Sequence, residues 1–110
     1  MDFHCVWFLQ QSFYVAGYMV FHAQGAGGTY TLTLAAARTL CASKGAKLAT
    51  LAQLQAAWDL GMDVCACGWL DDGSARFPIQ WPNSDCGSEP AGLRTWVHDT
   101  NRLFNAYCFK

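Results

Sequence analysis

Apolar residues recur at helical spacing in two stretches of the first half of the chain. In residues 34–44 they share one face of a helix, which also carries a cysteine (Leu34, Ala37, Leu40 and Cys41). Thr33 precedes this stretch as an N-cap, and Gly45 follows it as a stop signal. The pattern therefore predicts a helix over 34–44 with Cys41 pointing inward.

The second helix is predicted over 51–60. Thr50 is its N-cap, Gln53 follows at the spacing of a capping box, and Gly61 ends the stretch. The expected buried stripe consists of Leu51, Leu54, Ala57 and Trp58.

The rest of the chain has the short apolar runs and turn residues that are typical of β-strands. Such runs occur at 18–22, 29–32 and 46–49, before and between the helices. From Val64 onward, Gly, Pro, Asn and Asp divide the chain into further short strands, expected near 67–70, 75–79, 94–98 and 105–109. Two early helices followed by an antiparallel half rich in turns predict an α+β domain.

Residues 1–17 form an apolar, aromatic leader. They lack the Lys or Arg that begins a signal peptide, although Val15-Ala16-Gly17 is an acceptable cleavage site. The leader is a signal peptide, a non-native or alternatively spliced segment, or an extra strand. We expect the domain itself to span 18–110, with no transmembrane helix and no membrane insertion.

Composition adds one strong constraint, which comes from the cysteines. The net charge of −1 gives no reason to expect a nucleic-acid partner. Six cysteines in 110 residues indicate a disulfide framework formed in an oxidising, extracellular compartment. They allow fifteen pairings, among which the sequence alone does not choose. The cysteines are Cys5, Cys41, Cys65, Cys67, Cys86 and Cys108.

No catalytic, metal or cofactor site is predicted. Cys65 and Cys67 are too close for the common zinc knuckle and one residue short of a thioredoxin-type pair, so a thiol oxidoreductase is the least favoured function. Asp71 and Asp72 are better explained by a solvated turn than by calcium binding. No serine stands in the glycine-framed turn of a hydrolase nucleophile.

Aromatic and cationic residues of the β-rich regions are the remaining candidates for chemistry. Aromatic faces stack on sugar rings, and Arg binds carboxylates through two parallel hydrogen bonds. Trp58 and Trp69 are expected in the core instead. The candidates are Tyr30, Phe77, Trp81 and Trp96, with Arg76, Arg94, His98 and Arg102 as nearby cations.

Several sequence runs occur together in a specific order between about residues 20 and 109. They are Tyr30-Thr31-Leu32-Thr33, Gly45-Ala46-Lys47-Leu48-Ala49-Thr50, Cys65-Ala66-Cys67-Gly68-Trp69-Leu70, Arg76-Phe77-Pro78-Ile79, Cys86-Gly87, Gly92-Leu93-Arg94-Thr95 and Ala106-Tyr107-Cys108-Phe109. In this order and spacing they resemble the Link module, the hyaluronan-binding domain of cartilage link proteins, aggrecan-type proteoglycans and related receptors.

The resemblance implies both a fold and a function. The fold is two α-helices packed on two small antiparallel β-sheets, similar to C-type lectins without their calcium loop. The implied disulfides are Cys41–Cys108 and Cys65–Cys86. The implied function is non-catalytic binding of hyaluronan or a related glycosaminoglycan in an aromatic and basic groove, in the extracellular matrix or in cell adhesion. Matrix proteoglycans or other proteins are further partners of this class.

The family's binding residues are only partly present. Tyr30 stands at a binding tyrosine, Phe77 and Trp96 replace two others, and His98 stands near the family's arginine. Arg76 and Arg94 are further candidate cations for the carboxylates of the polymer. Thr29 and Ser88 stand where the family has a lysine and an aromatic residue. These departures leave an alternative, a Link-fold protein-interaction module with weakened or lost hyaluronan binding.

Two cysteines have no partner in the family pattern. Cys67 stands where the family usually has alanine, and Cys5 lies in the leader. Either the two form a third bridge, or Cys67 is a small buried thiol.

Overall fold

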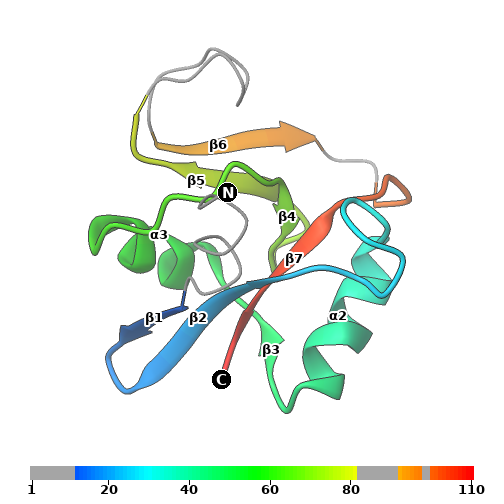
Figure 1. The fold of residues 1–110 in the computed structure, drawn as a ribbon, viewed down its shortest axis with the longest axis horizontal. Coiled ribbons are helices and arrows are strands. Elements are labelled where there is room, and N and C mark those ends of the chain that lie inside the picture. Colours follow the sequence, from blue (N-terminus) through cyan, green and yellow to red (C-terminus); the bar gives the residue numbers. More distant parts are fainter. Residues whose placement is uncertain (1–11, 82–91, 98–99) are drawn as a thin grey trace, which may run out of the picture.

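Strands from both ends of the chain meet in one sheet, which is flanked by two helices (Figure 1). A computed structural model gives this fold, and it describes residues 12–81, 92–97 and 100–110. The strands are β1 (Ser12–Val15), β2 (Tyr18–Ala23), β3 (Lys47–Leu48), β4 (Gly68–Trp69), β5 (Ala75–Ile79), β6 (Gly92–Val97) and β7 (Asn105–Phe109). The helices are α2 (Leu34–Ser43) and α3 (Leu51–Asp59).

The sheet consists of two antiparallel groups joined by one parallel pair. Its order is β1-β2-β7-β4-β5-β6, with β3 paired to β7 outside this path. The predicted two antiparallel sheets are therefore hydrogen-bonded into a single mixed sheet. The link is the short parallel pair of β4 and β7, in which Gly68 lies beside Asn105 and Trp69 beside Ala106. The α+β architecture itself is confirmed.

Side-chain hydrogen bonds fix the start of each helix as the sequence predicts. The Thr33 hydroxyl oxygen accepts a hydrogen bond from the amide of Ala36 at 3.2 Å. At α3 the Thr50 hydroxyl accepts from the Gln53 amide at 3.1 Å, and the Gln53 side chain accepts from the Thr50 amide at 2.9 Å. This reciprocal pair is a capping box, which satisfies amides that the first helical turn leaves without partners.

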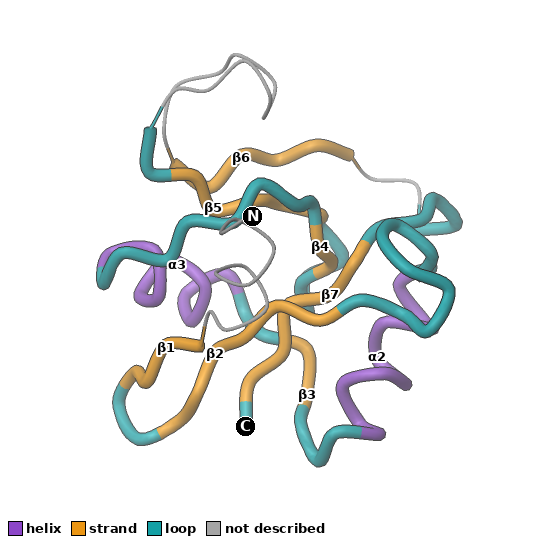
Figure 2. Tube along the Cα trace, in the orientation of Figure 1, coloured by secondary structure: helices purple, strands orange, loops and turns teal. Residues whose placement is uncertain are grey.

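The core lies on both faces of β7, and strand alternation assigns its residues to the two helices. Ala106 and Cys108 belong to the cluster that contains Ala37 and Cys41 of α2. Tyr107, which points the opposite way, belongs to the cluster beneath α3 with Leu54 and Ala57. Figure 2 shows the two helices on opposite sides of β7. Because β7 is packed on both faces, residues that contact its ends are held in fixed positions.

Part of the predicted leader forms a strand. Residues Ser12–Val15 pair with β2 in antiparallel register, from Ser12 opposite Phe21 to Val15 opposite Tyr18. These four residues form a strand in the structure, while residues 1–11 lie outside the described part of the chain. No helix in the described part is both long and apolar enough to cross a membrane.

The prediction of a strand at 29–32 is wrong. This segment is a loop, in which Leu32 makes an isolated bridge to Phe104. Tyr30 has a φ of 54°, in the left-handed region that a strand cannot use. Contacts with the end of β7, described below, override the β propensity of these residues.

Gly68 of β4 has no room for a side chain, because the Tyr107 ring of the neighbouring strand β7 lies against it. A Cβ atom there would lie 2.5 Å from Cδ2 of the Tyr107 ring and 3.2 Å from the backbone of Ala106. We expect Gly68→Ala to lower the free energy of unfolding by about 2 kcal/mol, because the fully buried ring must shift. Urea unfolding measures this change. Gly27→Ala is the control because its Cβ would meet only the exposed Thr31, and an equal loss in both variants would contradict the prediction.

Candidate functional site

Tyr30 and Trp81 are the predicted aromatics that the described part of the chain presents at the surface, and Trp81 is 74% exposed. Tyr30 is the one whose surroundings the structure fixes by hydrogen bonds to Asn105 and Cys67. Its side chain is 41% exposed. Its backbone amide donates to Oδ1 of Asn105 at 2.6 Å, and its hydroxyl accepts from the Cys67 amide at 2.8 Å. The Tyr30 and Phe104 rings meet in a T-shaped contact, with centroids 6.0 Å apart and planes at 83°. Tyr30 is therefore held by one backbone contact and two side-chain contacts, while part of its ring stays open to solvent.

Asn105 is the buried residue that holds the Tyr30 loop to the sheet. Its side chain is completely buried at the start of β7. Its Oδ1 atom must face the Tyr30 amide, which can only donate a hydrogen bond. Its Nδ2 atom then faces the Thr29 hydroxyl at 3.2 Å and Nε2 of His22 at 2.9 Å. Each polar atom of the Asn105 amide group therefore has a partner.

His22 must be neutral in this arrangement. Nε2 of His22 faces the Nδ2 donor of Asn105, so it has to be the unprotonated, accepting nitrogen. The imidazole also packs against the Tyr107 ring, with centroids 5.4 Å apart. Burial lowers the pKa of His22 from 6.5 to about 4, since it disfavours the charged form. Asn105, which holds Tyr30, and its partner His22 are thus both uncharged at neutral pH.

Arg102 and Phe104 continue this surface from Tyr30. The guanidinium carbon of Arg102 lies 5.5 Å from the centre of the Phe104 ring, within the range of a cation–π contact. Phe104 is buried, whereas Arg102 is exposed. Arg102, Phe104 and Tyr30 therefore form a row of consecutive contacts, which we call the Tyr30–Arg102 surface.

Phe77 does not have the role that its sequence position predicts. Its side chain is 6% exposed and belongs to the core cluster that contains Trp69 and Ile79. The strand alternation of β5 turns Phe77 inward with its neighbours Ala75 and Ile79. The prediction that Phe77 offers a stacking face to a sugar is therefore wrong.

Arg76 is partly buried beside Phe77, and its guanidinium already donates hydrogen bonds to other atoms of the protein. Nε of Arg76 donates to the Ser74 hydroxyl at 3.0 Å, and Nη1 donates to the Leu93 carbonyl at 3.4 Å. Arg76 therefore links β5 to the preceding turn through Ser74 and to β6 through Leu93.

Arg94 and Trp96 are placed only through their backbone. Arg94 lies opposite Phe77 in the β5–β6 register. Trp96 lies beside the irregularity between Ala75 and Arg76. His98 is outside the described residues.

Comparison with known proteins identifies the family. The model of the extracellular link domain matches residues 19–109, which is most of the chain. This chain belongs to the Link domain family. Stabilin-1 from Mus musculus is 43% identical over 93 residues, and stabilin-1 from Homo sapiens is 39% identical over the same length. Each match covers 83% of this chain but only 4% of the relative, so the chain spans a small part of these much longer proteins.

Membership in the Link domain family indicates the general kind of function of this chain. Link domains are glycosaminoglycan-binding modules rather than enzymes, and they act outside the cell or at its surface. In the described part of the chain, no three His, Cys, Asp or Glu residues come together in a way that could hold a metal ion.

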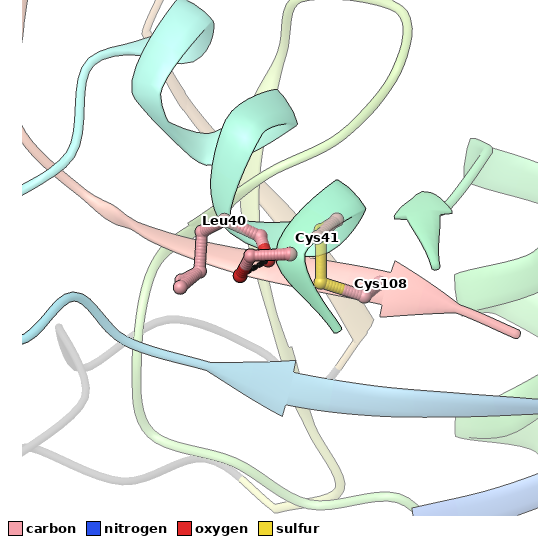
Figure 3. The surroundings of a disulfide bond; sticks show 4 residues. Leu40, Cys41 and Cys108 are labelled. Atoms are coloured by element: carbon pink, nitrogen blue, oxygen red, sulfur yellow. Dashed lines mark hydrogen bonds between the residues drawn. A yellow bond between two sulfur atoms is a disulfide. The ribbon is translucent and has the colours of Figure 1, made fainter. Parts of the chain in front are cut away.

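The disulfides of the Link domain follow the family pattern where they are described. Cys41 of α2 is bonded to Cys108 of β7, with Cα atoms 5.6 Å apart (Figure 3). Cys65 is also disulfide-bonded, and its predicted partner Cys86 lies outside the described residues.

Cys67 is a free, buried thiol, so the bridge from Cys5 to Cys67 is wrong and the alternative is correct. Burial raises the pKa of Cys67 to about 12, because the core disfavours a thiolate. Reactivity requires the thiolate, so this site does not suit thiol–disulfide exchange.

A shallow hollow of about 230 Å³ lies at the start of α2. Residues of the helix and of the segment before β7 line it (Thr33, Leu34, Ala35, Arg38, Thr100 and Asn101). Arg38 forms an ion pair with Asp71 at 2.5 Å across the surface. The charge of Arg38 is thus already compensated within the domain.

The sequence did not indicate Asn105 as a residue of the site, and it did not indicate which aromatic ring Arg102 contacts. Asn105 is a polar residue at the start of an apolar run, which was a signal of a buried polar role. Arg102 was recognised as a cation near aromatics, but its contact with Phe104 two residues later depends on how the chain enters β7. Local spacing did not indicate which aromatic it would meet.

Proposed function

We propose that this Link domain binds an acidic polysaccharide of the hyaluronan type, without covalent chemistry. The observation that carries the proposal is the fixed, half-exposed ring of Tyr30 at a binding position of the family. A sugar ring can stack on its open part, and the contacts with Asn105, Cys67 and Phe104 order the tyrosine before the ligand arrives. An aromatic ring that is already ordered loses little conformational entropy on binding.

Further ligand contacts in this proposal come from β6 and the segment after it. Trp96 is the second candidate for stacking, and Arg94 and His98 are candidates for contacts with carboxylates. Arg76 has a smaller role than its sequence position suggests, because its guanidinium already has partners in Ser74 and Leu93.

We expect Tyr30→Ala to weaken hyaluronan binding about tenfold, since the variant loses the stacking face. Calorimetric titration with hyaluronan oligosaccharides measures the change. Tyr14→Ala is the matched control, because Tyr14 is a 75% exposed tyrosine on β1. Tyr30→Phe keeps the ring and should retain most of the affinity. Equal affinities of the Tyr30→Ala and Tyr14→Ala variants would refute the role of Tyr30.

The burial of Phe77 favours a second candidate function. With that ring in the core, and with Ser88 and Thr29 at two other binding positions, the sugar-binding set is reduced. A Link-fold module that contacts protein would tolerate these losses. The same titration separates the two functions, because a protein-binding module would show no heat of binding with hyaluronan even in the unmodified domain.

A further inference from the structure

We propose that Arg102 binds a carboxylate of the polysaccharide whose neighbouring sugar stacks on Tyr30. This inference rests on the proposed function and adds a residue that the family's binding positions do not include. It follows from the Tyr30–Arg102 surface, in which an exposed cation and an exposed aromatic ring contact the same buried ring, Phe104.

Arg102 is free to bind a ligand, unlike Arg38 and Arg76. Arg38 is paired with Asp71, and Arg76 donates to Ser74 and Leu93. Arg102 is exposed and makes no ion pair with any described residue. Its charge is therefore uncompensated within the part of the domain that the structure describes.

The described lysines lie elsewhere on the molecule. Lys44 caps the end of α2, and Lys47 pairs with Phe109 at the far end of β7. Four residues of strand, or about 13 Å, separate Phe109 from Asn105, where Tyr30 is held. Lys110 follows directly after Phe109. The described cation beside Tyr30 is therefore Arg102.

The charge of Arg102 also acts on Cys67, a hydrogen-bond partner of Tyr30. Burial raises the pKa of the Cys67 thiol, and the positive charge of the Arg102 guanidinium acts in the opposite direction and partly offsets this rise. The Cys67 amide is the group that donates to the Tyr30 hydroxyl. Arg102 thus contacts the Phe104 ring, and its charge acts on the Cys67 thiol; both residues are neighbours of Tyr30.

Arginine is chemically suited to this role. Its planar guanidinium contacts an aromatic ring through its face and keeps its N–H edge for a carboxylate. The contact with Phe104 limits the side chain to part of its conformational range, which reduces the entropy lost on binding. A uronic acid presents one carboxylate beside its ring, so one sugar can stack on Tyr30 while the carboxylate of that sugar or the next one reaches Arg102.

The test compares two ligands and three variants. The ligands are hyaluronan oligosaccharides and the same oligosaccharides with their carboxylates reduced to primary alcohols. We expect Arg102→Gln to bind the native ligand about fivefold more weakly and the reduced ligand as the unmodified domain does. Lys44→Gln removes an equal charge at the end of α2 and should change neither affinity. Arg102→Lys keeps the charge without the planar fork. Its affinity for the native ligand should lie between that of the unmodified domain and that of Arg102→Gln.

Each outcome decides a separate question. If the unmodified domain does not bind native hyaluronan, the proposed function fails and the role of Arg102 fails with it. If it binds, and Arg102→Gln binds the native ligand equally well, the function stands and the role of Arg102 is refuted. An equal loss with both ligands also refutes the role, because the contact would not involve a carboxylate. Thermal unfolding of each variant shows whether a loss of binding reflects loss of the fold, in which case Arg102→Lys decides.

Discussion

Replacing Cys41 and Cys108 together by serine should lower the free energy of unfolding by about 4 kcal/mol. The disulfide joins residues 67 positions apart, so it closes a long loop in the unfolded chain and limits the conformations available there. A domain of this size has a total stability of roughly 5–15 kcal/mol, so the loss would be a large fraction of it. Urea unfolding under non-reducing conditions measures the difference.

The position of this bridge makes the effect global. Cys41 lies on the buried face of α2, and Cys108 lies on β7, a strand whose residues belong to both core clusters (Figure 3). Removing the bridge therefore frees a helix from the strand on which the rest of the sheet is built. Cys67→Ala is the control, because it removes a buried sulfur that closes no loop. A double-serine variant that is no less stable than Cys67→Ala would contradict the prediction.

Local patterns were sufficient to predict the elements whose shape depends on nearby residues. Both helices have the expected caps, and the strands at 75–79 and 105–109 have the expected bounds. Capping boxes and helical periodicity involve residues at most a few positions apart, so the chain around them specifies them. Cys41 and Trp69 were likewise correctly predicted in the core, since helical spacing and residue type decide their burial.

The site was predicted less completely, because distant contacts decide it. Tyr30 was predicted as a binding residue, but its left-handed backbone is imposed by Asn105, 75 positions further along the chain. Phe77 was misplaced because both faces of β5 are largely covered: Pro78 points away from Phe77 and is buried as well. In such a strand, alternation does not distinguish a core residue from a surface residue.

Acid should destabilise this Link domain through His22. In the unfolded chain a histidine takes up a proton near pH 6.5, whereas in the folded domain burial lowers the pKa of His22 to about 4. Between these values the unfolded state binds more protons than the folded state, so stability decreases as the pH decreases. The contribution of neutral His22 is fully present above about pH 6.5 and is lost as the pH falls to 4. The whole shift corresponds to about 3 kcal/mol.

The contacts of His22 explain why the fold cannot easily accommodate the proton. A protonated Nε2 would face the Nδ2 donor of Asn105 with no acceptor between them. Turning the amide of Asn105 would satisfy His22 but would set Nδ2 against the Tyr30 amide, which also donates. In either orientation one hydrogen bond is lost in a buried place, where an unmade bond costs about 1–3 kcal/mol. The Tyr107 ring on the other side of the imidazole offers the proton no compensating negative charge at these pH values.

His22→Gln separates this effect from the titration of carboxylates. Glutamine can accept the hydrogen bond from Asn105 and carries no charge at any pH, so its variant should lose less stability than the unmodified domain between pH 7 and pH 4. Urea unfolding at several pH values gives both curves, and the carboxylates cancel in their difference. His98→Gln provides a matched control for a histidine elsewhere in the sequence. Parallel curves for the unmodified domain and His22→Gln would show that His22 is not the group that couples acid to unfolding.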